Sequence, residues 1–127
     1  MDITRLPTTN FRTLFPNGIP NTTKYLVITV KSGDTEKTVV RLGTDKYVFH
    51  KDILADFAQE VFGDRKVTSR TGVTINALGG GSIMISQKNV YWLYDFSGTY
   101  GFDPDKEATG KLLLADIGDD FKIDIEE

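Results

Sequence analysis

The segment Lys24–Lys31, which reads Lys-Tyr-Leu-Val-Ile-Thr-Val-Lys, constrains the fold of this chain more than any other. β-Branched residues dominate it, and such residues favour extended backbone. Leu26, Ile28 and Val30 fall on one face of the strand that it would form. We therefore expect a central strand of a β-sheet, with other elements covering that apolar face.

The rest of the chain alternates strand-like and helix-like patterns. A Ser-Gly-Asp turn at 32–34 joins the first strand to the second, which predicts an antiparallel hairpin. The other predicted elements are a strand over 36–42, an amphipathic helix over 51–62 ended by Gly63, strands over 73–77, 82–87 and 90–95, a helix opened by Asp103-Pro104, and a strand over 121–125. This ββαβββαβ order predicts an α+β fold with a mixed six-stranded β-sheet flanked by two α-helices.

Length and composition favour one domain. The chain has 127 residues, no cysteine and a net charge of −3, with three of its four prolines in the first 20 residues. We expect an irregular N-terminal arm over 1–21 and a single domain over 22–127. Without basic blocks, bilayer-length apolar runs or cysteines, the sequence predicts a cytoplasmic monomer that binds neither nucleic acid nor membrane.

The single histidine, His50, lies directly before the helix predicted over 51–62. Imidazole titrates near neutral pH, and a helix N-terminus offers unpaired N–H groups and a partial positive charge. A histidine beside amides that can hold an anion suits phosphoryl chemistry. The residues alone leave open the alternative that His50 only satisfies a nearby carbonyl group.

Two glycine-containing segments are further candidates. Ser97, Gly98 and Thr99 follow an aromatic strand, and their hydroxyls could donate to phosphate oxygens, although an ordinary loop is the alternative. Gly79-Gly80-Gly81 leads into a strand rather than a helix, and no Gly-Lys-Ser/Thr follows, so it is not a nucleotide-binding loop. We interpret this triple glycine first as a turn or bulge and second as a segment that shapes a substrate site.

Other classes of site lack their signatures. One histidine and no cysteine leave mostly carboxylates as metal ligands, and the acidic C-terminal stretch lacks calcium-loop spacing. The sequence predicts no metal site and no cofactor. By composition alone, Lys24 and Arg41, on the first two strands, are ordinary surface cations.

Several of these segments together resemble a known family. They are Lys24-Tyr25, Val39-Val40-Arg41, His50-Lys51-Asp52-Ile53, Leu78-Gly79-Gly80-Gly81 and Tyr94-Asp95-Phe96-Ser97-Gly98-Thr99-Tyr100-Gly101. In this order and at nearly these spacings, they are similar to the protein phosphohistidine phosphatase family, which includes the Janus and ocnus proteins. The resemblance runs from about residue 22 to the C-terminus.

The resemblance implies an activity: metal-independent hydrolysis of phosphohistidine, and possibly phospholysine, on proteins. It places the catalytic histidine at His50, a substrate-contacting lysine at Lys24, and phosphate binding at Ser97, Gly98 and Thr99. Amides at His50 and Lys51 would hold the phosphoryl oxygens, while the Lys51 side chain adds positive charge. Arg41 and the triple glycine would support the site.

Two questions stay open from the sequence. His50 could act as a general base and proton shuttle for an attacking water, or it could attack phosphorus directly. The chain could also be a catalytically silent module of the same fold that binds phosphate or phosphopeptides. A purely structural role for these residues, with no phosphate binding, is the third alternative.

Overall fold

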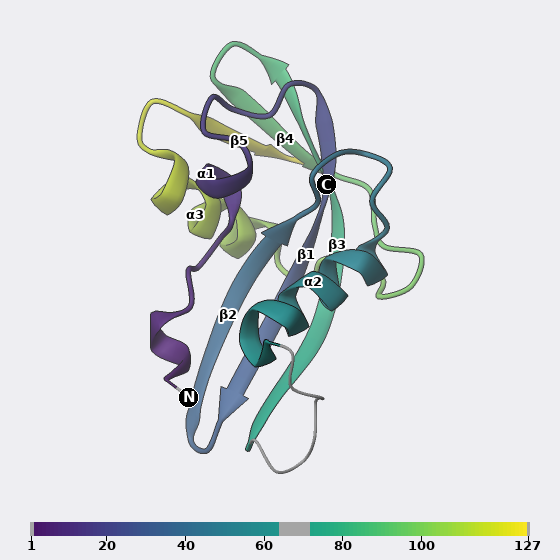
Figure 1. Cartoon of the computed structure of the whole chain (residues 1–127). Helices are drawn as coiled ribbons and strands as arrows, with labels where there is room; N and C mark the ends of the chain where they lie inside the picture. Colours follow the sequence, from purple (N-terminus) through teal and green to yellow (C-terminus); the bar gives the residue numbers. More distant parts are fainter. Residues whose placement is uncertain (1, 64–71, 127) are drawn as a thin grey trace.

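The computed structural model describes residues 2–63 and 72–126. Its elements in chain order are the 3₁₀ turn η1 (Ile3–Arg5), α1 (Phe11–Leu14), β1 (Thr22–Ser32), β2 (Thr35–Leu42), α2 (His50–Phe62), β3 (Val73–Gln87), β4 (Val90–Tyr94), α3 (Lys106–Ile117) and β5 (Lys122–Ile125). Figure 1 shows α2 in front of the long strands β1 and β3. No helix in the described ranges is long and apolar enough to span a bilayer.

The α+β class and the mixed sheet are confirmed, but the described residues form five strands and three α-helices rather than six strands and two helices. The described residues form a five-stranded sheet of order β2-β1-β3-β4-β5, antiparallel except for the parallel pair β4 and β5. The strands expected over 73–77 and 82–87 are one strand, β3, because the triple glycine continues extended pairing with β1. A register shift opposite Val27 and Ile28 marks the irregularity at that point.

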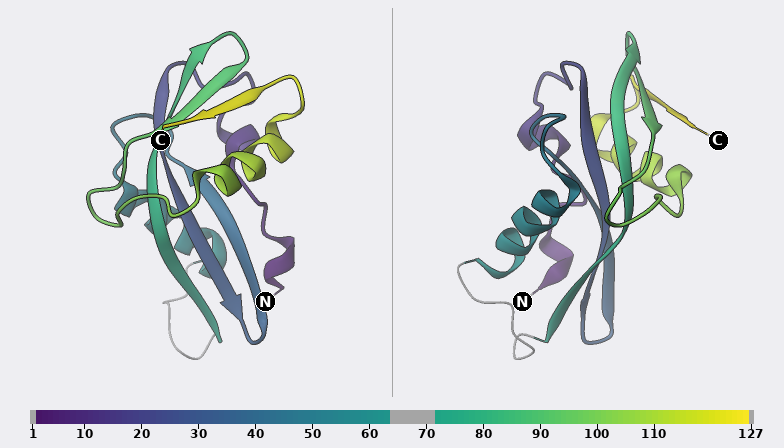
Figure 2. Two further views of the ribbon diagram at one scale, coloured as in Figure 1. Left: turned by 180° about the vertical axis from the view of Figure 1, so that it is seen from behind. Right: turned by 90° about the vertical axis from the view of Figure 1, so that its right-hand side faces the viewer.

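Helices cover both faces of the sheet, as the two views of Figure 2 show for α2 and α3. Alternate residues of β1 point to opposite sides of the sheet, and two hydrophobic clusters result. Leu26, Ile28 and Val30 pack with Phe57 of α2 in the first cluster, while Tyr25 belongs to the second. That cluster contains residues of α1 and α3. The central strand predicted from the sequence is thus buried between two layers.

Residues 2–21 contain more regular structure than the expected irregular arm. They contain η1 and α1, and their buried apolar side chains join both clusters: Ile3, Leu6, Phe11, Phe15 and Ile19. The arm also runs beside the outer edge of β2, where the Val40 N–H donates to the Thr8 carbonyl at 2.8 Å. The apolar residues between the prolines supply the buried surface that fixes the arm.

The second predicted helix begins later than Asp103-Pro104. Its N-cap is Asp105, which accepts from the Ala108 N–H, because the Asp103 carboxylate is already engaged. Asp103 is buried and accepts hydrogen bonds from the Tyr25 hydroxyl at 2.9 Å and the Thr109 hydroxyl at 2.7 Å. This buried carboxylate joins the centre of β1 to the first turn of α3.

Candidate functional site

His50 is the first residue of α2, and its ring packs against the middle of the sheet. It is 7% exposed, and Nε2 lies 2.9 Å from the Gly81 carbonyl oxygen. Because a carbonyl oxygen can only accept, the neutral ring donates from Nε2 and keeps its lone pair on Nδ1. The backbone of β3 therefore selects which nitrogen of His50 can act as a base.

The surroundings of His50 lower its pKa and so favour the neutral imidazole. Burial is the largest cause that lowers the pKa of His50, and the positive charge of Lys24 lowers it further. The hydrogen bond to Gly81 and the charge of Asp95 oppose this shift but do not cancel it. A neutral imidazole with a fixed tautomer has the protonation state that a general base requires at pH 7.

The triple glycine makes room for this ring. A Cβ atom placed on Gly80 would lie 3.0 Å from His50 Cδ2 and would overlap the carbonyl oxygen of Tyr25. A Cβ atom on Gly79 would overlap the carbonyl group of Phe102. The triple glycine thus lies at a bulge of β3, as first expected. Because these residues have no side chains, His50 and Phe102 can both approach the backbone closely.

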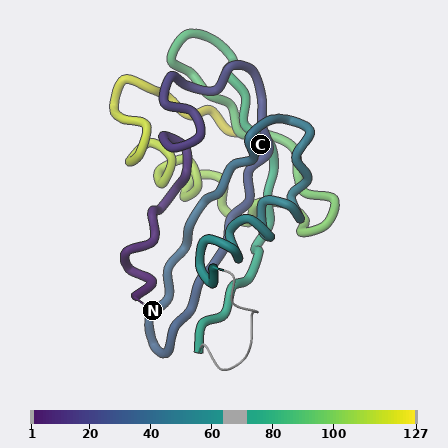
Figure 3. Tube along the Cα trace, viewed as in Figure 1, coloured from purple at the N-terminus to yellow at the C-terminus, as the bar shows by residue number. Residues whose placement is uncertain are grey.

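One of these neighbours is the loop 96–102. It closes on itself through a pair of hydrogen bonds between Ser97 and Gly101, at 3.0 and 2.8 Å. It is docked on β3 because the Gly80 N–H donates to the Gly101 carbonyl at 3.1 Å. Figure 3 shows this loop, in green, projecting beside the N-terminal end of α2, in teal.

A pocket of about 350 Å³ lies where the loop meets the start of α2. Its lining residues are Lys24, Phe49, His50, Lys51, Phe96, Gly98 and Thr99. The N-cap of α2 is Phe49, whose side chain has no acceptor and makes no capping hydrogen bond. The Phe49 N–H donates to the Asp52 carboxylate and the Asp52 N–H to the Phe49 carbonyl, so the N–H groups without a side-chain cap are those of His50 and Lys51, beside two lysines. This arrangement suits an anion.

Five of the predicted site residues meet in this pocket: Lys24, His50, Lys51, Gly98 and Thr99. Ser97 does not line it. Its side chain is 1% exposed, and its hydroxyl oxygen accepts from the Tyr100 N–H at 3.0 Å. In this structure Ser97 shapes the loop that presents its two neighbours.

Arg41 lies away from the pocket, so its expected supporting role there is not seen. It is 2% exposed and forms a paired hydrogen-bonded ion pair with Glu60 of α2, at 3.0 and 2.8 Å. It also donates to the carbonyls of Pro7 and Thr8. Rather than an ordinary surface cation, Arg41 is a buried link between β2, α2 and the arm.

Sequence reasoning missed the two aromatic walls, Phe49 and Phe96, and the carbonyl of Gly81. Phe49 directly precedes His50, and Phe96 directly precedes Ser97. Their positions next to the two candidate segments could have indicated that Phe49 and Phe96 line the site. No sequence pattern indicates a backbone carbonyl as the partner of the histidine.

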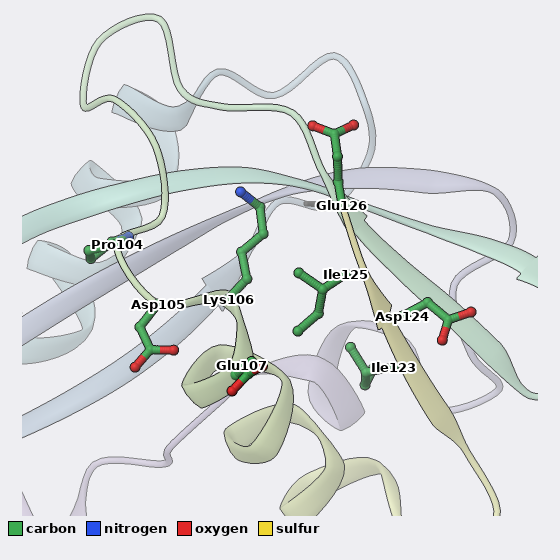
Figure 4. Close-up of a pocket in the computed structure, with 8 residues that line it drawn as sticks. All are labelled: Pro104, Asp105, Lys106, Glu107, Ile123, Asp124, Ile125 and Glu126. Carbon is green, nitrogen blue, oxygen red and sulfur yellow. The ribbon is translucent and has the colours of Figure 1, made fainter.

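A larger open cavity, of about 780 Å³, lies between the start of α3 and β5. Figure 4 shows four carboxylates around it, those of Asp105, Glu107, Asp124 and Glu126, with Lys106 among them. This charge disfavours a phosphate. Within residues 2–63 and 72–126, no group of three histidine, aspartate or glutamate side chains is placed to hold a metal ion.

Comparison with known proteins identifies the family. The family model described as Janus/Ocnus family (Ocnus) matches residues 18–119, which is most of the chain. The chain belongs to the Janus/Ocnus family. No curated protein matches it.

The family match also brings a correction. The resemblance drawn from the motifs is wrong in calling the family a phosphohistidine phosphatase family, because the matching family is Janus/Ocnus and its description names no enzyme activity. Membership of the Janus/Ocnus family therefore does not assign a reaction to the His50 pocket.

Proposed function

We propose that the His50 pocket binds the phosphoryl group of a phosphorylated histidine on a protein and hydrolyses its P–N bond without a metal ion. The observation that carries this proposal is the imidazole of His50 at the start of α2, in a pocket that Lys24 and Lys51 also line and where the N-cap side chain supplies no acceptor. The pocket combines a base with positive charge for an anion. Phospholysine, which also contains a P–N bond, is a second substrate of the same chemical class.

In the proposed reaction, the phosphoryl oxygens lie against the helix N-terminus and the Gly98–Thr99 segment. Water attacks phosphorus while Nδ1 of His50 takes a proton from it. The P–N bond breaks, and that proton is returned to the leaving nitrogen, so the products are inorganic phosphate and the unmodified side chain. Positive groups already aimed at the oxygens stabilise the charge that develops on them.

A catalytically silent phosphate-binding or phosphopeptide-binding module is the second candidate. It is favoured by the low exposure of His50, because a ring that is 7% exposed offers an attacking water little access. Direct attack of His50 on phosphorus would use the same nitrogen, Nδ1, and would leave a phosphorylated His50 as an intermediate.

The deciding experiment measures phosphate release from a phosphohistidine peptide at pH 7, with and without EDTA. The wild type is compared with His50→Ala and with Lys31→Gln, a control substitution elsewhere on β1. We expect turnover that survives EDTA, persists in Lys31→Gln and is lost in His50→Ala.

Two further readouts separate the alternatives. A wild type that releases no phosphate but shows NMR shifts at residues 50–52 and 97–99 on phosphate titration would support the binding module. Absence of both turnover and shifts would overturn both functions. Rapid quenching that traps phosphate on His50 would replace the general-base mechanism by direct attack.

A further inference from the structure

Exposed aromatic side chains gather around the His50 pocket. Among the described residues, the large apolar side chains that are most exposed are Tyr47, Phe49, Phe96 and Phe102, at 76%, 61%, 49% and 65%. All four belong to the two loops that meet at the pocket, and Phe49 and Phe96 line it. Soluble domains rarely concentrate exposed rings in this way unless the surface binds a partner.

The two phenylalanine rings that line the pocket have different neighbours. The Phe49 ring lies under two cations, with Lys24 Nζ and Lys51 Nζ each 5.6 Å from its centroid. Phe96 also lines the pocket, and its ring centroid lies 5.0 Å from that of Phe102, over which Lys106 Nζ lies at 5.7 Å. The pocket therefore has two cations at Phe49, which suit the phosphoryl group, and a pair of aromatic rings at Phe96 and Phe102 that extends beyond the lining residues.

The backbone of Phe102 is held in place although its ring is exposed. The backbone of Phe102 forms a bridge with Gly80, and its carbonyl group packs closely on Gly79. A ring on a fixed backbone loses little conformational freedom when a partner covers it, which is the property of an aromatic anchor in an interface. The triple glycine thus fixes the backbone of Phe102 as well as the histidine.

We propose that Phe96 and Phe102 form a docking subsite for a bulky apolar side chain next to the phosphorylated residue of a protein substrate. The inference rests on the proposed function, because the phosphoryl group has to occupy the Phe49 side of the pocket. It commits the pocket to a polypeptide segment rather than to a free phosphorylated amino acid. Phe102 is then a specificity residue outside the reacting centre.

The test uses two peptides that differ only beside the phosphorylated position. Both carry a hydrolysis-resistant phosphonate analogue of phosphohistidine; one has leucine on each side of it, and the other has alanine. Dissociation constants are measured by fluorescence anisotropy. We expect the wild type to bind the leucine peptide about tenfold more tightly.

Three variants locate the preference. Phe102→Ala should bind both peptides equally, with the alanine peptide unchanged within about twofold. Phe102→Tyr, which keeps the ring, and Ile85→Ala, which removes an exposed apolar side chain of β3 outside the pocket lining, should keep the preference. Equal binding by the wild type, or an unchanged preference in Phe102→Ala, would overturn the docking subsite.

Failure of the docking subsite and failure of catalysis give different results. A protein that discriminates between the phosphonate peptides but releases no phosphate keeps the subsite and loses the hydrolysis. One that hydrolyses both phosphohistidine peptides at equal kcat/KM keeps the hydrolysis and loses the subsite. Concentration-dependent dimerisation that Phe102→Ala abolishes would assign these rings to a second copy of the chain and overturn the proposal.

Discussion

At the scale of single residues, the pKa of His50 is open to direct measurement because the chain contains one histidine. We expect an NMR titration of the folded protein to give a pKa below the ordinary value of 6.5, as burial and Lys24 lower it. Because the general base has to be neutral, kcat/KM for phosphate release should fall as pH drops through that lowered pKa. A histidine that titrates at or above 6.5 would contradict this prediction.

The same shift has a consequence for stability. As pH falls below 6.5, the unfolded chain takes up a proton on His50 while the folded chain does not. The free energy of unfolding should therefore decrease between pH 6.5 and the folded pKa, and His50→Gln should remove this part of the pH dependence. Urea denaturation at a series of pH values measures both.

Lys24 supplies positive charge at the pocket. Its Nζ donates to the Lys46 carbonyl and lies over Phe49 at the pocket, so Lys24→Gln removes one positive charge from the site. We expect phosphate to bind roughly fivefold more weakly, which corresponds to about 1 kcal/mol, and the pKa of His50 to rise. Lys31→Gln on the same strand should change neither, and an equal effect there would mean that only net charge matters.

At the scale of the elements, Gly80→Ala tests the close packing of α2 on β3. The added methyl group would overlap the Tyr25 carbonyl and press on His50, so we expect a loss of about 2 kcal/mol in the free energy of unfolding. Gly98→Ala is the matched control, since nothing lies within 4 Å of a Cβ atom there, and it should cost at most about 0.5 kcal/mol. Chemical denaturation of both variants measures these changes. Similar losses of stability in the two variants would contradict the prediction that Gly80 permits close packing.

Most elements could be predicted because their signals are local. The β-branched run predicted the start of β1 to within two residues. The helix expected over 51–62 is α2, and the N–H of Gly63, the residue predicted to end it, donates to the Gln59 carbonyl. The predicted break between strands 73–77 and 82–87, at the triple glycine, was wrong because of contacts that are distant in the sequence. Glycine usually interrupts a strand, but here β1 on one side, with His50 and Phe102 against the glycines, keeps the backbone extended.

The candidate site could be predicted only in part. His50, Gly98 and Thr99 stood out because their residue types and positions suit an anion, and the pocket contains all three. The place of Ser97 and Arg41 depends on tertiary contacts that no pattern encodes.

Gly110 is a related case: a glycine inside α3 looks unfavourable, yet a Cβ atom there would lie 3.1 Å from Ile123 Cγ2, so it permits the close approach of α3 to β5.

At the scale of the whole molecule, Arg41 joins three parts of the fold through Glu60 and the carbonyls of Pro7 and Thr8. Arg41→Lys keeps the charge but cannot make the paired contact and both carbonyl contacts at once. We expect it to lower the free energy of unfolding by about 2 kcal/mol while phosphate affinity stays unchanged, because Arg41 is outside the pocket lining. Urea denaturation measures the free energy of unfolding, and phosphate titration measures the affinity. Weaker phosphate binding at unchanged stability would contradict this prediction and support a role for Arg41 in the site.

The pairing of the arm with β2 affects how these molecules behave toward one another. A sheet edge with free N–H and C=O groups can recruit a strand from another molecule and so begin aggregation. The β2 edge is occupied at Val40 by Thr8 and Thr9 of the arm, while the opposite edge, β5, is four residues long and exposes Lys122 and Asp124. The folded chain thus offers little template for intermolecular strand addition, and loosening the arm would expose one.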